Sequence, residues 1–311
     1  MVDFVAFGIV IDDIALHDGT THMGLLGGGG PQTAWGMAAA LGTGERVGLC
    51  AEVGADFDAG WLAPLHRMGV NTAGVRVGDG LTPRAWQQID GEGNRDHVWR
   101  VPPRGSITFG KPIESILPPG YTAAHGFHWG LHPESPSLDN ARLLLSRDQR
   151  VCLETFKPPE TPLREADLRA LLAACTIFSP NWREAVGIVG VDDYTQVIAR
   201  FREASCKYLA LRRGAHGADV WDFAQGRGVR VPAVPVTVVD TVGAGNAFCG
   251  ALLATYESQG IERAACHAVA AASYLVEQYG LPPAPPDPVE YARRVDYAQQ
   301  RLERLGYPPL C

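Results

Sequence analysis

Apolar runs and small-residue helical stretches alternate along this chain. Residues 4–11 are apolar throughout and end at Asp12-Asp13, as in a strand that is buried on both faces of a parallel sheet. Residues 34–41 are small and apolar and end at Gly42, which predicts a buried helix with a glycine at its C-terminus. The alternation resumes at residues 151–154, 166–174 and 176–179. We therefore expect an α/β fold with a central, mostly parallel sheet flanked by helices on both faces.

One segment departs from this pattern. Residues 81–103 mix polar and aromatic side chains around a glycine-rich turn at 91–94, which predicts a half-exposed antiparallel hairpin. Two roles stay open for its tryptophans, Trp86 and Trp99: closing over a ligand, or packing against a second copy of the chain.

The stretch around Gly243 carries the sharpest chemical signal. The β-branched run 234–239 leads through Gly243 and Gly245 into the apolar stretch 247–256, which predicts a strand that turns into a helix. Glycines let the backbone approach a ligand, and the first N–H groups of a helix have no intrahelical partner, so the turn can bind anionic oxygen. A tight corner with no ligand is the alternative. We favour a phosphate site.

Two further sets of polar residues lie at the ends of predicted strands. Asp12-Asp13 fall where open α/β sheets bind ligands, although paired acids there often only begin a turn. Asn181 and Glu184 follow the apolar strand 176–179 and share one face of a helix turn. Together they can hold hydrated Mg²⁺. The alternative is a capping box at the helix N-terminus.

Histidine and cysteine give weaker signals. His125, His128 and His132 lie on one predicted strand, where His125 and His128 point to opposite faces, so we expect no metal site there and expect His128 or His132 to face a substrate. The seven cysteines are scattered singly, a pattern typical of reduced core thiols.

Composition narrows the class of protein. The 311 residues are 46% apolar and 20% charged, as in ordinary globular proteins. A net charge of −7 disfavours nucleic acid as a partner, and no apolar run approaches the roughly 18 residues that span a bilayer. The N-terminal residues look like a strand and not like a signal peptide, so we expect a cytoplasmic protein that does not insert into membranes.

Four motifs, in chain order, resemble those of the ribokinase-like (PfkB) carbohydrate and nucleoside kinase family. The segment Asp240-Thr241-x-Gly243-Ala244-Gly245 resembles the second signature of that family, and the glycine loop 27–30 followed by Leu41-Gly42 resembles the first. Asn181-x-x-Glu184 resembles a third motif, and residues 208–220, with Gly214-x-x-Gly217, resemble the nucleotide-binding segment.

The resemblance implies a fold and an activity. It implies one ribokinase-like α/β domain over residues 1–311, with a small β-sheet lid formed from about 13–27 and 81–103. It also implies ATP-dependent, Mg²⁺-dependent phosphorylation of a hydroxymethyl group on a sugar or nucleoside. A homodimer formed through the lid is the packing role left open for Trp86 and Trp99. The residue roles that it implies are acceptor binding by Asp13, Gly28, Gly29 and Thr33; nucleotide binding by Asn181, Arg212, Gly214, Gly217 and Asp240; Mg²⁺ binding through water by Asn181 and Glu184; and stabilisation of the transferred phosphoryl group by Gly243, Ala244 and Gly245.

The chain departs from the family at three positions. Asn246 stands where the family has its catalytic aspartate, Thr33 where it commonly has asparagine, and Arg212 where it more often has threonine. A carboxamide can orient a hydroxyl group but cannot usefully take its proton, and general-base catalysis is typically worth about 10²–10⁴ in rate.

Three explanations of Asn246 stay open. The chain is a divergent kinase with another base, for which Asp240, Asp13 and a histidine are candidates; or the residue was substituted deliberately to trap substrate; or the protein is a pseudokinase that binds nucleotide or sugar and regulates a partner. We favour the kinase because the Asn181/Glu184 pair is retained. The sequence predicts neither the acceptor nor the nucleotide donor preference.

Overall fold

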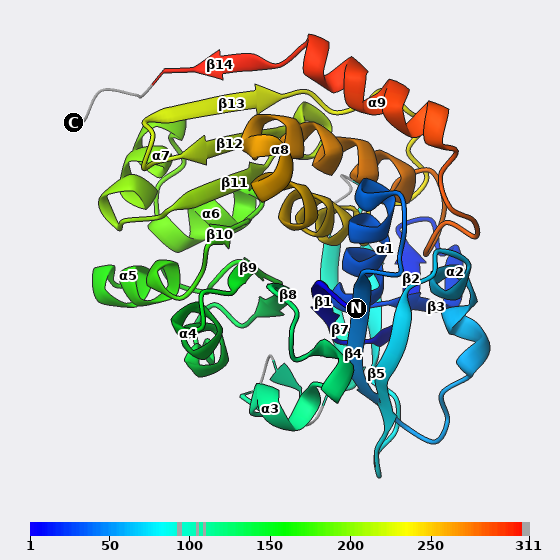
Figure 1. Cartoon of the computed structure of the whole chain (residues 1–311). Coiled ribbons are helices and arrows are strands. Elements are labelled where there is room, and N and C mark those ends of the chain that lie inside the picture. The colour runs from blue at the N-terminus through cyan, green and yellow to red at the C-terminus, as the bar shows by residue number, and fades with distance from the viewer. Residues whose placement is uncertain (92–94, 104–105, 108–109, 307–311) are drawn as a thin grey trace.

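The computed structural model describes residues 1–91, 95–103, 106–107 and 110–306 and contains two sheets (Figure 1). The large sheet contains β1 (Phe4–Phe7), β4 (Val47–Val53), β5 (Asn71–Val77), β8 (Gly126–Leu131), β9 (Arg150–Thr155), β10 (Ile177–Phe178), β11 (Tyr208–Arg212), β12 (Ala218–Asp222), β13 (Arg227–Val231) and β14 (Glu303–Leu305). The small sheet contains β2 (Val10–Leu16), β3 (Thr21–Gly27), β6 (Arg84–Ile89) and β7 (Arg95–Val101). The helices are α1 (Gly29–Leu41), α2 (Ala63–Arg67), α3 (Ile113–Ile116), α4 (Asp139–Ser146), α5 (Glu165–Ala173), α6 (Trp182–Val189), α7 (Tyr194–Glu203), α8 (Ala244–Leu275) and α9 (Pro288–Gln300).

The large sheet is parallel over most of its width. Its strand order is β14-β13-β12-β11-β10-β9-β8-β1-β4-β5, and every pairing from β11 to β5 is parallel. The pairings from β11 to β14 are antiparallel. Parallel strands need crossover connections and burial on both faces, which the helices supply. The predicted mostly parallel α/β class is confirmed.

Each face of the large sheet has its own hydrophobic core. Phe4 and Ala6 face the core formed with α1, α8 and α9, and Val5 and Phe7 face the core formed with α4, α5, α6 and α7. Consecutive residues of a strand point to opposite faces, so the four apolar residues of β1 serve both cores. Figure 1 shows the two helix groups on opposite sides of the strands.

The prediction of one strand over residues 4–11 is wrong. Gly8, with φ 91°, ends β1, and β2 begins at Val10 in the other sheet. Both strands are buried, so nothing in the apolar pattern marks the break between them. The small sheet therefore continues directly from β1, the third strand from the β5 edge of the large sheet.

The small sheet has the order β3-β2-β6-β7, with β2 and β6 parallel. The predicted hairpin in 81–103 is confirmed as the antiparallel pair β6 and β7, and part of its turn, 92–94, lies outside the described residues. That this separate sheet acts as a lid, and that residues 1–311 form one domain, stay predictions.

The prediction of a strand over residues 234–239 is also wrong. Pro232 and Pro235 have no N–H group to donate to a ladder, and the segment lies outside any strand. The N–H groups of Val239 and Asp240 donate instead to the carbonyl of Val276, over 2.7 and 3.2 Å. Val276 lies at the C-terminal end of α8, beyond a kink at Gly260 (φ 76°). The segment that leads into α8 is therefore fixed to the opposite end of the same helix.

Among the described residues, no helix is long and apolar enough to cross a membrane.

Candidate active site

Two helices begin at glycines, but α1 offers few free N–H groups, because the Gly30 N–H donates to the carbonyl of Gly8 over 3.0 Å and Pro31 has none. Helix α1 follows Gly28 (φ 82°) and α8 follows Gly243 (φ 84°). Neither helix has a side-chain cap or an acidic residue in its first turn. The partial positive charge of both N-termini is therefore not neutralised by the chain itself, and each can bind an anion.

Glycine contacts hold these two N-termini together. A Cβ atom on Gly36 of α1 would lie 2.2 Å from the carbonyl oxygen of Ala247, and one on Gly250 of α8 would lie 2.1 Å from that of Thr33. The two helix backbones are thus in direct contact. A Cβ atom on Gly29 would lie 3.7 Å from Asn246 Oδ1, so Asn246 lies beside the glycine loop at the start of α1.

Thr33 has a positioning role and no exposed surface. Its hydroxyl group donates to the carbonyl of Asn246 over 3.2 Å and contacts His128 Nδ1 at 2.9 Å. The structure therefore brings Thr33 to the site but places its side chain behind Asn246. This burial does not favour the expected direct contact between Thr33 and an acceptor.

Arg212 connects three parts of the site. Its Nη2 atom lies 2.8 Å from Glu154 Oε2 and 3.4 Å from Glu184 Oε2, and it donates to the carbonyl of Ser179 over 2.7 Å. A Cβ atom on Gly245 would lie 1.8 Å from Nη1. The guanidinium group thus lies between two buried carboxylates and the first turn of α8.

The Asn181/Glu184 pair forms the capping box that was the alternative prediction. Asn181 Oδ1 accepts the Glu184 N–H and Glu184 Oε2 accepts the Asn181 N–H, both over 2.8 Å. Burial raises the pKa of Glu184 to about 7, although Arg212 acts in the opposite direction. Glu184 Oε2 also accepts from Arg212, but Oε1 accepts only from Asn181 Nδ2, over 2.8 Å, and keeps a lone pair that can accept from a metal-bound water. Capping and the predicted Mg²⁺ role are therefore compatible.

Asp240 supplies the oxygen atom that best fits a Mg²⁺ ion. Its Oδ1 accepts the Val242 N–H over 3.0 Å, whereas its buried Oδ2 has no hydrogen-bond partner among the described residues. Burial raises the pKa of Asp240. An unpartnered carboxylate oxygen is the hard ligand that Mg²⁺ takes directly or through water.

The paired acids Asp12 and Asp13 face different surroundings. Asp12 accepts the Gly28 N–H over 3.3 Å and a Gln87 N–H over 2.7 Å, and burial raises its pKa to about 6. Asp13 is paired with Arg100, whose side chain is 42% exposed, and accepts the Gly24 N–H. The structure therefore brings Asp12, and not the predicted Asp13, to the glycine loop.

The strand β8 places His128 against the Thr33 hydroxyl group, behind Asn246. His128 is fully buried, and its Nε2 lies 3.4 Å from Glu154 Oε1. Burial lowers the pKa of His128, but Cys249 and Glu154 outweigh that effect and raise the pKa to about 9. His132 pairs with Glu134 at 3.1 Å. The burial of His128 does not favour a substrate contact, and the expectation that His128 or His132 faces a substrate stays a prediction.

The turn between β11 and β12 holds the remaining predicted positions. Gly214 begins a 3₁₀ turn directly after Arg212 and Arg213, and Gly217 (φ 82°) ends it. A Cβ atom on Gly217 would lie 2.0 Å from the carbonyl of Val231, so only glycine fits there. The structure places this turn beside the arginine; its contact with a nucleotide stays a prediction.

Sequence reasoning missed two charged residues of the site. Glu154 stands at the carboxyl end of a buried parallel strand, a position that could have marked it. Arg95, in the small sheet, acts electrostatically on Asp12, Glu154, Glu184 and Asp240. No sequence signal distinguishes Arg95, because its approach depends on how the two sheets pack.

Known proteins resemble this chain over most of its length. The model of the pfkB family carbohydrate kinases matches residues 1–287. A cytidine kinase of Thermococcus kodakarensis is 29% identical over 260 residues, which are 82% of this chain and 89% of that protein. An ATP-dependent ribose-1-phosphate kinase of Halopiger xanaduensis is 28% identical over 261 residues, 83% of each chain.

Solved structures share the fold. Arabidopsis thaliana ribokinase complexed with ribose and ATP has a TM-score of 0.73 at 20% identity, over 95% of this chain and 99% of that one. The two sheets and the helices that flank the larger one define a ribokinase-like α/β protein. The chain belongs to the pfkB family of carbohydrate kinases, as its motifs suggested.

Proposed function

We propose that this chain transfers a phosphoryl group from ATP to a hydroxyl group of a nucleoside or a pentose, with Mg²⁺ as cofactor. The observation that carries the proposal is the meeting of two uncapped helix N-termini at Asn246, with Arg212 against Gly245. The relatives named cytidine kinase and ribose-1-phosphate kinase support an acceptor that contains a pentose.

The residues divide between acceptor and donor. Asp12, beside Gly28, hydrogen-bonds the hydroxyl groups of the acceptor. The N–H groups after Gly243 and the Arg212 guanidinium bind the phosphate that is transferred, where negative charge is concentrated in the transition state. When bound, Mg²⁺ neutralises charge on the phosphates, and Glu184 and Asp240 would hold it through water.

Asn246 orients the acceptor hydroxyl through its side-chain oxygen. Of the alternative bases, Asp13 is held by Arg100 and His128 is fully buried, whereas Asp240 has an unpartnered oxygen. A loose phosphoryl-transfer transition state needs little help from a base, so positioning and the anion site supply most of the acceleration.

A second candidate function is a pseudokinase that binds nucleotide or sugar and regulates a partner. Asn246 favours it, because a carboxamide at this position removes the usual proton acceptor. Cytoplasmic location, a homodimer formed through the small sheet and the absence of a nucleic-acid partner remain proposals alongside both candidates.

The test is an ADP-release assay with Mg-ATP and a panel of cytidine, other nucleosides, free pentoses, hexoses and ribose 1-phosphate. The unaltered chain is compared with Asn246→Asp and Asp240→Asn. Turnover by the unaltered chain that Asp240→Asn abolishes supports the kinase. Turnover only after Asn246→Asp identifies a disabled base, and ATP binding without turnover in either form supports the pseudokinase.

A further inference from the structure

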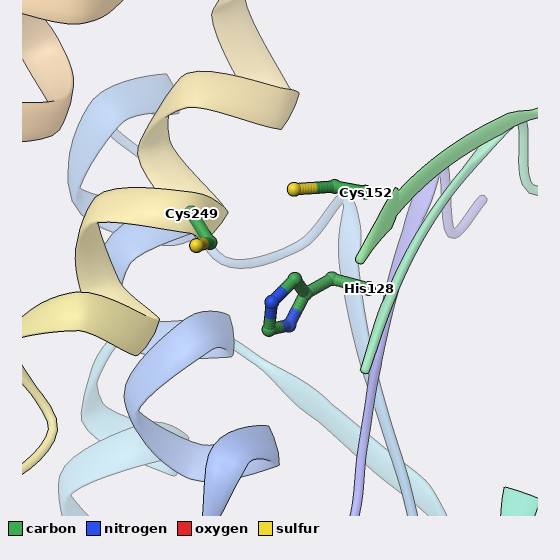
Figure 2. Close-up of side chains that lie close together, drawn as sticks. All are labelled: His128, Cys152 and Cys249. Carbon is green, nitrogen blue, oxygen red and sulfur yellow. The ribbon is translucent and has the colours of Figure 1, made fainter. Parts of the chain in front are cut away.

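Three buried side chains from separate elements converge below the reaction centre (Figure 2). His128 lies on β8, Cys152 on β9 and Cys249 in α8. One ligand atom of each lies within 4.8 Å of the others, and all three residues are buried. One imidazole and two thiols form a set of donor atoms with which proteins bind soft and borderline metal ions.

A hydrogen bond between Nδ1 and Thr33 fixes the orientation of the His128 ring. The Thr33 hydroxyl group donates to the carbonyl of Asn246, which leaves its oxygen to accept the His128 Nδ1 hydrogen over 2.9 Å. The opposite ring nitrogen, Nε2, is buried and has no hydrogen-bond partner among the described residues. A hydrogen bond to one ring nitrogen that presents the other to a metal is the usual arrangement around a histidine ligand.

The cluster demands positive charge. His128 Nε2 lies 3.4 Å from Glu154 Oε1, and Glu154 Oε2 lies 4.0 Å from the sulfur of Cys249. A divalent cation at this place is balanced by two thiolates and the Glu154 carboxylate, with Arg212 beside them.

We propose that His128, Cys152 and Cys249 bind a zinc ion, and that Glu154, which lies outside the 4.8 Å cluster, moves in as the fourth ligand. Zn–S and Zn–N bonds of about 2.3 and 2.0–2.1 Å place tetrahedral ligand atoms roughly 3.5–3.8 Å apart. The cluster, with ligand atoms within 4.8 Å, therefore has to contract by about 1 Å, a change within reach of side-chain rotation.

The zinc site is separate in position and chemistry from the oxygen ligands proposed for Mg²⁺. It joins α8 to β8 and β9, and it connects to the reaction centre through Thr33 on one side and Arg212 on the other. The zinc ion stabilises the residues that support the anion site, among them Thr33 and Arg212, and touches no substrate. Zinc binding at this site is independent of whether the chain is an active kinase.

The test measures metal content directly. Untagged protein from zinc-supplemented cells is analysed by inductively coupled plasma mass spectrometry, and about one zinc per chain is expected. Cys152→Ser and Cys249→Ser are expected to lose most of it. Cys175→Ser, at another buried free cysteine, is the matched control and is expected to retain it. Cobalt-substituted protein is expected to show a thiolate-to-cobalt charge-transfer band that the first two variants lack.

X-ray absorption on the unaltered protein keeps the test independent of variant folding. Two sulfur and two nitrogen or oxygen neighbours around zinc are expected. A shell of nitrogen and oxygen alone overturns the proposal, as does protein that contains no zinc and takes up none on refolding with it. Equal zinc in Cys249→Ser and Cys175→Ser, or a Cys152–Cys249 disulfide in protein purified without reductant, overturns it as well.

Discussion

The guanidinium group of Arg212 lies against the backbone of Gly245, so that a Cβ atom on Gly245 would come within 1.8 Å of Nη1. The arginine thus adds a full positive charge to the partial charge of the α8 N-terminus. Glu154 and Glu184 hold it there from the other side. The anion site is therefore assembled before any nucleotide arrives.

Gly245→Ala is expected to weaken ATP binding. The added methyl group has to displace the Arg212 guanidinium, and the loss of one charge-assisted contact is worth about 1–3 kcal/mol, or roughly 10–100-fold in Kd. Calorimetric titration with a non-hydrolysable ATP analogue measures it. Gly120→Ala is the control, because a Cβ atom there meets nothing within 4 Å. Equal affinities in the two variants would show that the arginine does not contact phosphate.

Arg212→Met is expected to lower the free energy of unfolding by about 3–5 kcal/mol, because it leaves the buried Glu184 without its cation and Glu154 with His128 alone. Urea denaturation at pH 7.5 measures the change. Arg147→Met is the control, since Arg147 pairs with Glu114 on the surface and such pairs contribute about 0–1 kcal/mol. A loss in Arg212→Met no larger than that of the control would refute the buried network.

Asp12→Asn and Asp13→Asn form a matched pair at neighbouring positions. Asp12 lies at the glycine loop, so its neutralisation is expected to raise the KM for the acceptor by about 10–100-fold and to leave ATP affinity unchanged. Asp13 is bound to Arg100, so its change is expected to alter KM much less. Steady-state kinetics with the best acceptor of the panel decides between them, and the reverse order of effects would restore Asp13 as the acceptor residue.

Acid is expected to destabilise the protein partly through His267. Burial and the charge of Arg263 lower the pKa of His267 to about 4, below its ordinary value of 6.5. The unfolded chain therefore binds more protons than the folded one below pH 6.5, and stability falls as the pH drops toward about 4.

His267→Gln is expected to recover about 1–2 kcal/mol of that loss at pH 5. Its measurement is the difference in urea denaturation between pH 7.5 and pH 5, with His66→Gln as the control at an exposed histidine. An equal pH dependence in the His267→Gln variant and the unaltered protein would contradict the assignment.

Local signals predicted much of this architecture. Apolar runs and glycine-ended helical stretches predicted the flanked, mostly parallel sheet, because a strand that is buried on both faces is apolar along its own length. The alternating polar hairpin predicted two strands of the small sheet for the same reason. The uncapped N-terminus of α8 followed from Gly243 and Gly245 alone.

The remaining site depended on information that is not local. The choice between Asp12 and Asp13 required knowing that the chain changes sheets at Gly8, and a run that is apolar on both sides of the break conceals it. Cys152 and Cys249 looked like isolated core thiols because only tertiary packing brings them to His128. Arg95 acts electrostatically on Glu184 only because the small sheet brings it near the site.

The glycine contacts between α1 and α8 limit how this enzyme can diversify. At Gly36 and Gly250 one helix backbone touches the other, so no side chain separates the two helices at these positions. Mutation cannot tune their separation in small steps, because any added atom forces the helices apart. New acceptor preferences can therefore evolve only through residues that surround this fixed pair, chiefly those of the small sheet.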